Sequence, residues 1–409
     1  MESIMKTTLK RLISLLLAVA MTLALTACAQ NAPAPSDPTD APTPAPAATP
    51  EPTPEATPEP SDDDVDGELI LDYEEPLQYA TQFTLTHYKG GYAILTIPHS
   101  GDTNWLLVPE GKSVPEELPE NTVVLQQPLN KIASGVTAMV SVIDAIGGLD
   151  NVVATTTKQE SWYLPNVAAA MEAGKLKYFG SYSEPDFELL MSEGIQLEVD
   201  STMILNKPEV MDKYKEVGIP CMVDCSSYEE HPLGRVEWVK LYGAILNMEE
   251  EAEAFFNEEA AKIETLSALE KTGKTAVMYY VSSDTYYLRN AGDYTVAMLN
   301  LAGGETIAPD VGPDKSGSTK MTFEEFYATC KDADYIFYVV LTCPFETREE
   351  MIAENALYAD FKAVQEDRVF TTRPGFSQSA AMLADVVVEI NSVLNDPTIE
   401  ETENLIKIK

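Results

Sequence analysis

Histidine and basic residues are scarce in this chain, and each scarcity excludes a class of protein. The 409 residues include only three histidines, His87, His99 and His231. A direct zinc or manganese carrier usually gathers several histidines with carboxylates, so this composition argues against one. The 27 lysines and arginines face 66 aspartates and glutamates, which gives a net charge of -39. A surface this acidic repels nucleic acid and anionic lipid, so we expect neither as a partner of the folded body.

Three further features are missing from the sequence. It has no Walker phosphate-binding loop, and no apolar run reaches the roughly 20 residues of a membrane-spanning helix, which excludes an ATPase and a permease. No nucleophile and base form a recognisable catalytic frame, so we expect no catalytic residue, no cofactor and no metal site. The spacing of four cysteines fixes neither a disulfide nor a metal site and favours small buried side chains: Cys221, Cys225, Cys330 and Cys343.

The N-terminus has the pattern of an export signal. Basic residues at 6, 10 and 11 precede an apolar stretch over 12–25, which has the length of a signal-peptide core. The stretch ends in Leu25-Thr26-Ala27-Cys28, which resembles the bacterial lipobox. We therefore expect residues 1–27 to be removed and Cys28 to carry a lipid that anchors the protein to the outer face of a membrane. The alternative is an ordinary secretory signal with an incidental cysteine.

Residues 28–66 have the composition of a tether. Eleven prolines occur between Pro33 and Pro60, and the segment has no basic residue and almost no large apolar one. Such a segment cannot bury a core and favours an extended, partly polyproline-like chain. The lipid anchor gives this tether a purpose, because it would hold the folded body away from the membrane.

The folded body is predicted to begin with a β-hairpin region over 67–129. Its strands are expected at 92–97 and 105–108, separated by a polar turn. From about residue 122 short strands alternate with amphipathic helices, a pattern typical of a parallel sheet covered by helices. We expect an N-terminal α/β lobe over 130–247. There, Ser134 is a plausible N-cap, and Ser226 and Ser227 have the spacing of capping boxes.

One long helix is predicted between two α/β lobes. Residues 248–271 have a continuous helical pattern that is long enough to cross a domain. A second α/β series follows over 272–396, with strands expected at 276–281, 335–341 and 369–372. Residues 397–409 read as a tail. The predicted fold class is therefore α/β, with two lobes joined by a single helix and preceded by a β-hairpin region.

Four stretches resemble a known family. They are YSEPDFE at 182–188, DSTMI at 200–204, SSYEEHPLGRVEW at 226–238 and ADFKAVQEDRVF at 359–370. They are similar to segments of the substrate-binding lipoproteins of iron-siderophore and cobalamin ABC importers, and the resemblance covers about 130–396.

The resemblance implies a function and partners. Members of this family hold a ligand in a cleft between two lobes bridged by one helix, a geometry that implies a largely preformed pocket. The expected ligand is a small-molecule iron chelate (a siderophore or haem) or a corrinoid, which would itself carry the Fe or Co. The expected partners are the membrane permease and ATPase of an ABC importer, and the protein is expected to be a monomer. The alternative is a cell-surface enzyme or an adhesion or sensor module built on the same fold.

Two glutamates are candidates for docking to the permease. The resemblance implies that one glutamate near a helix start in each lobe reaches an arginine pocket of the permease, and Glu188 and Glu324 occupy these places. Glu325 is an alternative second anchor. A glutamate at a helix N-terminus also stabilises the helix dipole, which is the competing interpretation.

The candidate ligand-binding residues are aromatic, hydroxyl and arginine side chains near predicted strand ends, where open α/β sheets bind ligands. Arg235 suits an anionic group, although a salt bridge to Glu229, Glu237 or another surface acid explains it equally well. Cobalamin-binding members of the family carry tryptophans where Tyr182 and Ser201 stand here, which weakens cobalamin as the specific ligand. The full set is Trp162, Tyr163, Tyr182, Ser201, Thr202, Arg235, Tyr286, Tyr287, Arg289, Arg373 and Phe376. His231 is interpreted as a capping residue rather than a ligand contact.

Overall fold

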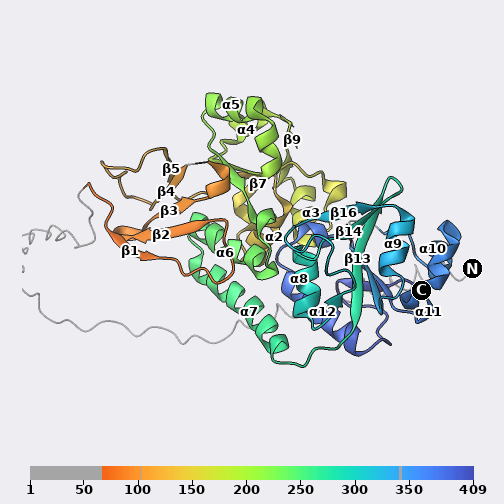
Figure 1. Ribbon diagram of the computed structural model, residues 1–409. Coiled ribbons are helices and arrows are strands. Elements are labelled where there is room, and N and C mark those ends of the chain that lie inside the picture. Colours follow the sequence, from red (N-terminus) through yellow and green to blue (C-terminus); the bar gives the residue numbers. More distant parts are fainter. Residues whose placement is uncertain (1–66, 102, 340–342) are drawn as a thin grey trace, which may run out of the picture. The chain divides into compact units, whose positions relative to one another are not determined.

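The computed structural model describes residues 67–101, 103–339 and 343–409 (Figure 1). The expected signal peptide, Cys28 and the tether lie outside these residues. In the part of the chain that is described, no helix combines the length and the apolar character needed to cross a membrane.

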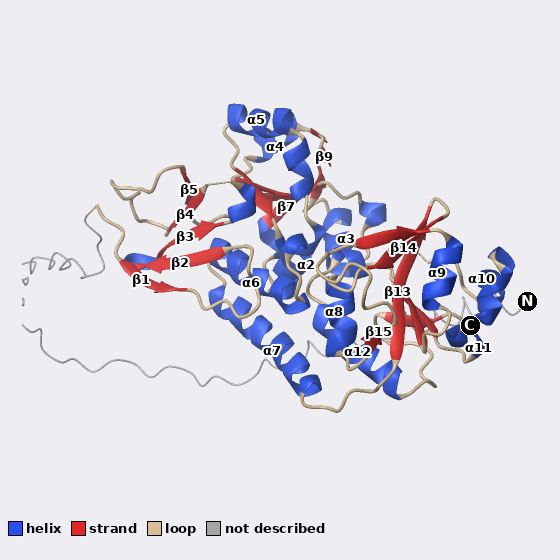
Figure 2. Cartoon of the chain, in the orientation of Figure 1, coloured by secondary structure: helices blue, strands red, loops and turns tan. Residues whose placement is uncertain are grey.

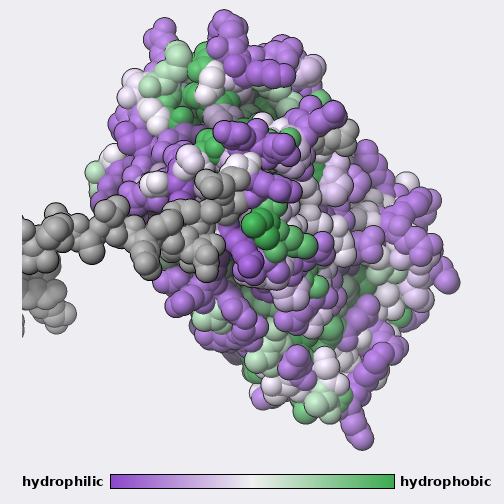
Figure 3. Space-filling model, turned by 90° about the vertical axis from the view of Figure 1, so that its left-hand side faces the viewer, coloured by the Kyte–Doolittle hydropathy of each residue, from purple (hydrophilic) through white to green (hydrophobic). Residues whose placement is uncertain are grey.

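The described chain begins with a five-stranded sheet rather than an isolated hairpin. Its strands follow the chain order β1 (Leu71–Glu74), β2 (Thr84–Tyr88), β3 (Tyr92–Thr96), β4 (Asn104–Val108) and β5 (Thr122–Gln126). The predicted hairpin is confirmed as β3 and β4, and the prediction of a hairpin alone is wrong. The edge strand β1 escaped notice because all four of its residues are exposed, so it has no alternating apolar pattern. Figure 3 views this side of the molecule and shows mostly hydrophilic surface with small hydrophobic patches.

Two buried carboxylates fasten the segment between β1 and β2 to the N lobe. The Glu237 carboxylate accepts the backbone N–H groups of residues 78, 79 and 80 at 2.7–2.8 Å. The Glu229 carboxylate accepts those of residues 81 and 82, each at 2.9 Å. Charge-assisted hydrogen bonds of this kind are about twice as strong as neutral ones. The N-terminal sheet is therefore attached through ionic contacts to the N lobe as well as through apolar packing.

The N lobe is a parallel sheet with the strand order β12-β11-β6-β7-β8. The strands are β6 (Ile132–Ser134), β7 (Val152–Thr155), β8 (Lys177–Tyr178), β11 (Leu197–Ser201) and β12 (Cys221–Asp224), and a short hairpin pairs β9 (Gly180–Ser181) with β10 (Glu184–Pro185). The helices are α2 (Thr137–Ala145), α3 (Pro165–Glu172), α4 (Phe187–Glu193), α5 (Pro208–Val217) and α6 (Pro232–Leu246). Ser134 is not the N-cap of α2. It ends β6, and its Oγ accepts the Val136 N–H at 3.0 Å, so the hydroxyl serves the turn before the helix.

The single connecting helix is α7 (Glu249–Ser267), slightly shorter than the predicted 248–271. It packs against α6 of the N lobe (Figure 2) and against α12 (Leu383–Asn395) of the C lobe. Phe256 and Ile263 are buried on its inner face. The chain therefore has the predicted fold class of two α/β lobes joined by one helix.

The C lobe is a mixed sheet with the strand order β16-β14-β13-β17-β18-β19, and β15 pairs with β13. The strands are β13 (Thr275–Ser282), β14 (Thr285–Arg289), β15 (Glu305–Thr306), β16 (Ser318–Met321), β17 (Tyr335–Tyr338), β18 (Val369–Thr372) and β19 (Leu405–Lys407). Besides α12, the helices are α8 (Tyr294–Leu301), α9 (Phe323–Cys330), α10 (Arg348–Glu354) and α11 (Lys362–Gln365).

The last residues belong to the C lobe and are not a free tail. Strand β19 pairs with β18 in antiparallel register, with Leu405 opposite Thr372. Leu405 and Lys407 are buried, because the edge of the sheet and α12 cover them. A three-residue strand is too short for a periodic signal, which explains why the sequence pattern missed it.

Candidate ligand-binding cleft and docking residues

The two lobes meet at a small cavity. From the N lobe it is lined by Ala138 of α2, Arg235 of α6 and Ser226, which begins the turn of 3-10 helix η6 (Ser226–Tyr228). From the C lobe it is lined by Tyr294, Phe376, Ser377, Ser379, Ala380 and Leu383. Its volume is about 50 Å³, room for one or two water molecules, each of which occupies about 30 Å³ in the liquid.

Arg235 dominates the chemistry of this cavity. Its Nε donates to the Glu229 carbonyl oxygen at 3.0 Å, and its Nη2 donates to the Ser227 carbonyl oxygen at 2.7 Å. The guanidinium lies 3.7 Å from the centre of the Tyr294 ring in the facing lobe, a cation–π contact. These bonds use two of its five donors, so the Arg235 side chain is fixed while donors remain for a ligand. The salt bridge to Glu229 or Glu237 considered from the sequence is absent from the described ion pairs.

The electrostatics around Arg235 combine opposing effects. Burial lowers the pKa of the Arg235 guanidinium, whereas Tyr294, Asp293 and Glu229 oppose this shift and the positive charge of Arg289 acts with it. A guanidinium stays charged in proteins despite such a shift, so Arg235 presents a cation with unused donors to the cavity.

A buried carboxyl holds the turn that presents Ser227 to Arg235. Asp224 ends β12 and accepts the Ser226 N–H at 2.8 Å and the hydroxyl of Tyr242. Burial raises the pKa of the Asp224 carboxyl, an effect that these hydrogen bonds and Arg235 oppose. The capping boxes predicted at Ser226 and Ser227 do not form. Helix α6 begins later, and the Nδ1 atom of half-buried His231 caps it by accepting the Leu233 N–H at 3.1 Å.

Direct hydrogen bonds hold the two lobes together beside the cavity. The Gln378 amide oxygen accepts the Tyr163 N–H at 3.0 Å, and its Nε2 donates to the Ser161 carbonyl oxygen at 2.6 Å. Ser141 of α2 accepts the Ala380 N–H at 3.0 Å. These contacts close the interface and leave a cavity of about 50 Å³ between the lobes. The prediction of a largely preformed pocket is therefore wrong for the described arrangement.

The N-lobe candidates are distributed over the interface and the core. Tyr163 is 44% exposed, and its Cβ would lie 3.0 Å from a Cβ added to Gly375, so it contacts the C lobe. Trp162 is buried and donates its Nε1–H to the Thr157 carbonyl oxygen at 3.2 Å. Tyr182 packs half-buried against the core. Ser201 and Thr202 lie half-buried where β11 ends, and neither lines the cavity between the lobes.

Of the C-lobe candidates, only Phe376 lines the cavity. Tyr286 is buried in the C-lobe core, where it stacks on Phe326. Tyr287 and Arg289 both pack on Tyr280: the Tyr287 ring stacks with its centroid 4.8 Å away, and the Arg289 guanidinium lies 5.1 Å from the ring centre.

Arg373 is engaged elsewhere, because it pairs with Glu401 at 3.1 Å and also donates to the Thr402 carbonyl oxygen. Sequence reasoning missed Tyr294 and Gln378. The N-cap Asp293, whose Oδ1 accepts the Thr295 N–H at 3.0 Å, gave a local signal for the helix that presents Tyr294. The bridging role of Gln378 depends on the facing lobe and has no local signal.

Glu188 and Glu324 occupy equivalent places in the two lobes. Each is the second residue of its helix, after a phenylalanine and a polar N-cap, Asp186 in α4 and Thr322 in α9. Both side chains are exposed, and within the described chain neither has a hydrogen-bond or ion-pair partner. Glu325 is engaged, because its carboxylate accepts the Thr322 N–H at 2.8 Å in a capping box. The arrangement therefore singles out Glu324 as the free carboxylate.

The described residues contain neither a metal-ligand cluster nor a disulfide. In residues 67–101, 103–339 and 343–409, no group of three or more histidine, cysteine, aspartate or glutamate side chains could hold a metal ion. The thiols of Cys221, Cys225, Cys330 and Cys343 are free.

Comparison with known proteins identifies the class. Residues 132–375 match the model of a family described as periplasmic binding protein. Because this match spans more than half of the chain, the protein belongs to the periplasmic binding protein family.

Two relatives are similar to this chain over most of its length. An uncharacterized lipoprotein of Methanocaldococcus jannaschii is 26% identical over 351 residues, covering 78% of this chain and 81% of that protein. A second uncharacterized lipoprotein of the same organism is 22% identical over 315 residues, covering 73% of this chain and 77% of its own length.

Solved structures share the fold. A periplasmic haem-binding protein from Pseudomonas aeruginosa has a TM-score of 0.53 and 14% identity, covering 68% of this chain and 98% of that one. A periplasmic binding protein from Veillonella parvula has a TM-score of 0.52 and 20% identity, covering 64% of this chain and 90% of its own. At such low identity these likenesses show the fold alone.

Proposed function

We propose that this protein is the extracytoplasmic solute-binding subunit of an ABC importer, anchored to the outer face of the cell membrane through a lipid on Cys28. Family membership, the lipobox-like sequence at 25–28 and two lipoprotein relatives support this proposal. Cell fractionation tests the anchor: Cys28→Ala should move the protein from the membrane to the soluble fraction. A variant that stays on the membrane would contradict the lipid anchor.

The proposed ligand is an anionic iron chelate, a siderophore or haem, with a corrinoid as the second choice. The observation that carries this proposal is Arg235, a fixed and partly unused guanidinium at the junction of the lobes, with the charge of Arg289 nearby. The haem-binding protein of the same fold gives the ligand class a precedent. Pockets for small molecules measure about 300–1,000 Å³, so the lobes must separate from the arrangement with a 50 Å³ cavity to admit such a ligand.

Calorimetric titration with ferric siderophores, haem and corrinoids tests the ligand class. Arg235→Gln should weaken binding about tenfold or more, because hydrogen bonds to charged groups contribute about 1.5–3 kcal/mol. Arg348→Gln is the control, since Arg348 pairs with Asp367 at 3.3 Å and does not line the cavity. An equal loss of affinity in the two variants, or an unchanged affinity in both, would contradict a ligand-binding cleft built around Arg235. Turnover of a small substrate, with no associated transport, would favour the surface-enzyme alternative.

Delivery is proposed to use Glu188 and Glu324. Their matched helix positions, their exposure and their lack of partners among the described residues suit two guanidinium pockets on a membrane permease. The ATPase of the importer would then power release into the cell.

A further inference from the structure

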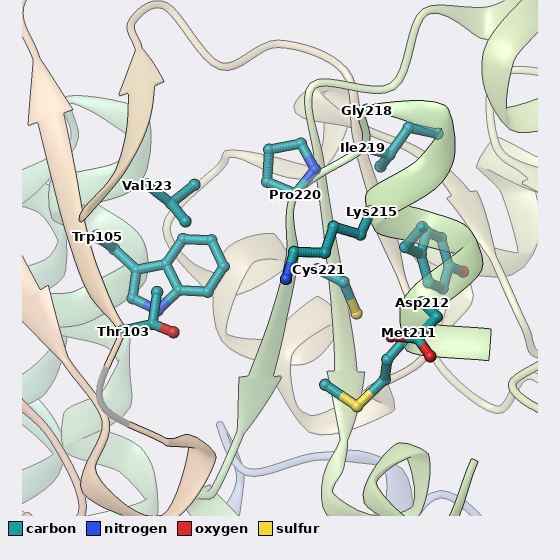
Figure 4. Close-up of a pocket in the computed structure, with 11 residues that line it drawn as sticks. Thr103, Trp105, Val123, Met211, Asp212, Lys215, Gly218, Ile219, Pro220 and Cys221 are labelled. Carbon is teal, nitrogen blue, oxygen red and sulfur yellow. The ribbon is translucent and has the colours of Figure 1, made fainter. Parts of the chain in front are cut away.

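A second cavity lies where the N-terminal sheet meets the edge of the N lobe. This side pocket has a volume of about 400 Å³, within the range of small-molecule sites. Trp105 of β4 and Val123 of β5 form one wall, and α5 together with the segment entering β12 forms the other (Figure 4).

The side pocket is separate from the cleft between the lobes. The two cavities share no lining residue. Trp105 and Val123 also precede residue 132, where the match to the family begins. The pocket therefore exists because this chain carries the N-terminal sheet in addition to the two lobes.

Two buried donors in the wall lack partners. Trp105 is 4% exposed and Tyr214 is fully buried, yet the Trp105 Nε1–H and the Tyr214 hydroxyl have no hydrogen-bond partner in the described chain. An unsatisfied buried polar group costs about 1–3 kcal/mol. Both side chains line the side pocket, although these two polar atoms are buried in the free protein, so a guest with hydrogen-bond acceptors would reach them through a small shift of the wall.

The floor of the pocket does not oppose a negative guest. Glu198 of β11 pairs in register with the lining residue Cys221, is fully buried, and has no partner for either carboxylate oxygen among the described residues. Burial raises the pKa of the Glu198 carboxyl well above its usual range, and it also raises the pKa of the Cys221 thiol. Burial therefore disfavours a negative charge on either group.

One cation completes the pocket. Figure 4 shows the Lys215 side chain extending from α5 toward the side of the pocket that Trp105 forms. The Lys215 side chain is exposed, and its ammonium has no partner in the part of the chain that is described. The exposed Asp212, one turn earlier on the same helix, also lines the pocket, so a guest of negative charge must lie nearer to Lys215 than to Asp212. The remaining wall is apolar and includes Ile219 and Pro220.

We propose that the side pocket binds a small, largely apolar organic anion, with an aromatic carboxylate as the simplest representative. Its ring would lie against Trp105 and Val123, and its carboxylate would accept hydrogen bonds from Lys215 and Tyr214. The proposal does not depend on the ligand of the cleft between the lobes.

Three matched naphthalene probes test the charge preference by calorimetric titration of the full chain. Naphthoate should bind saturably, naphthylmethanol should bind more weakly, and naphthylmethylamine should bind weakest because Lys215 repels it. Lys215→Met should weaken naphthoate binding about tenfold, the equivalent of one charge-assisted hydrogen bond. Lys213→Met is the matched control, since Lys213 lies on the same helix but pairs with Glu216 at 2.9 Å. Arg235→Gln should leave naphthoate binding unchanged, which separates this site from the cleft.

Tyr214→Phe gives an independent readout. It should weaken naphthoate binding and raise the melting temperature of the free protein, because it removes a buried hydroxyl that lacks a partner. A lowered melting temperature would show that water already satisfies the hydroxyl and would overturn the proposal. So would a preference for the amine, equal losses in Lys213→Met and Lys215→Met, or no saturable binding of naphthoate.

Discussion

Glu237 should decide whether the N-terminal sheet stays attached to the N lobe. Its carboxylate is fully buried and accepts three backbone N–H groups, those of Gln78, Tyr79 and Ala80. Lys240 lies 3.4 Å from it and also pairs with Glu75 at 3.0 Å. Glu237→Gln keeps the shape of the side chain, but it turns an amide N–H₂ toward at least one of these backbone donors and leaves that donor without an acceptor.

The magnitude follows from the contacts that are lost. Removing one partner of a buried ion pair costs about 3–5 kcal/mol, and a hydrogen bond to a charged group contributes about 1.5–3 kcal/mol. Glu237→Gln keeps one or two of the three hydrogen bonds, so we expect a loss of about 3–4 kcal/mol in the free energy of unfolding. Because the bonds join the segment between β1 and β2 to helix α6 of the N lobe, the first consequence should be local opening of residues 75–82.

Hydrogen exchange and urea unfolding measure the two parts of this prediction. The amides of residues 78–80 should exchange faster in Glu237→Gln, and the unfolding midpoint should fall. Glu264→Gln is the control, because Glu264 is an exposed residue of α7. A loss under about 1 kcal/mol with unchanged protection at 78–80 would refute the idea that the carboxylate holds the sheet in place.

Three further outcomes are expected. The double variant Glu188→Ala/Glu324→Ala should abolish uptake of labelled ligand, while purified protein keeps its affinity and its unfolding free energy within about 0.5 kcal/mol; normal import would contradict docking. Burial raises the pKa of Asp200 from 3.8 to about 6, so this group stabilises the fold below about pH 4 and loses that contribution as the pH rises through 6. The unfolding free energy of Asp200→Asn should therefore exceed that of the wild type by up to about 3 kcal/mol at about pH 8 and by little at about pH 4. A difference that does not change with pH would contradict the raised pKa of Asp200. Gln378→Ala removes two hydrogen bonds between the lobes, worth about 1–3 kcal/mol together, and should speed ligand association in stopped-flow mixing; an unchanged rate would mean that they do not limit entry.

Elements with strong local patterns could be predicted from the sequence. The alternation of strand and helix predicted both lobes, β18 falls at the predicted 369–372, and α7 lies within the predicted 248–271. In each case the pattern of apolar residues and the flanking breakers act over a single element. Local information is sufficient there because the buried face repeats along the chain.

Features that depend on distant segments could not be predicted. Glu229 has the spacing of a capping box with Ser226, yet its carboxylate binds the backbone of residues 81 and 82, about 150 positions away in sequence. Tyr286 has the composition expected of a cleft residue but packs inside the C lobe, because β14 turns it toward α9. Arg235 and Phe376 were found from residue type and position, whereas their partner Tyr294 becomes apparent only when the lobes are placed together.

Glu229 links the N-terminal segment to the turn that holds Arg235. Its carboxylate receives the N-terminal segment, while its carbonyl oxygen receives Nε of Arg235 at 3.0 Å. A shortened chain that began at the family boundary would leave the Glu229 carboxylate without its backbone donors, and the turn that aims Arg235 would relax. Removal of the N-terminal sheet should therefore alter the position of Arg235 at a cavity that the sheet does not line.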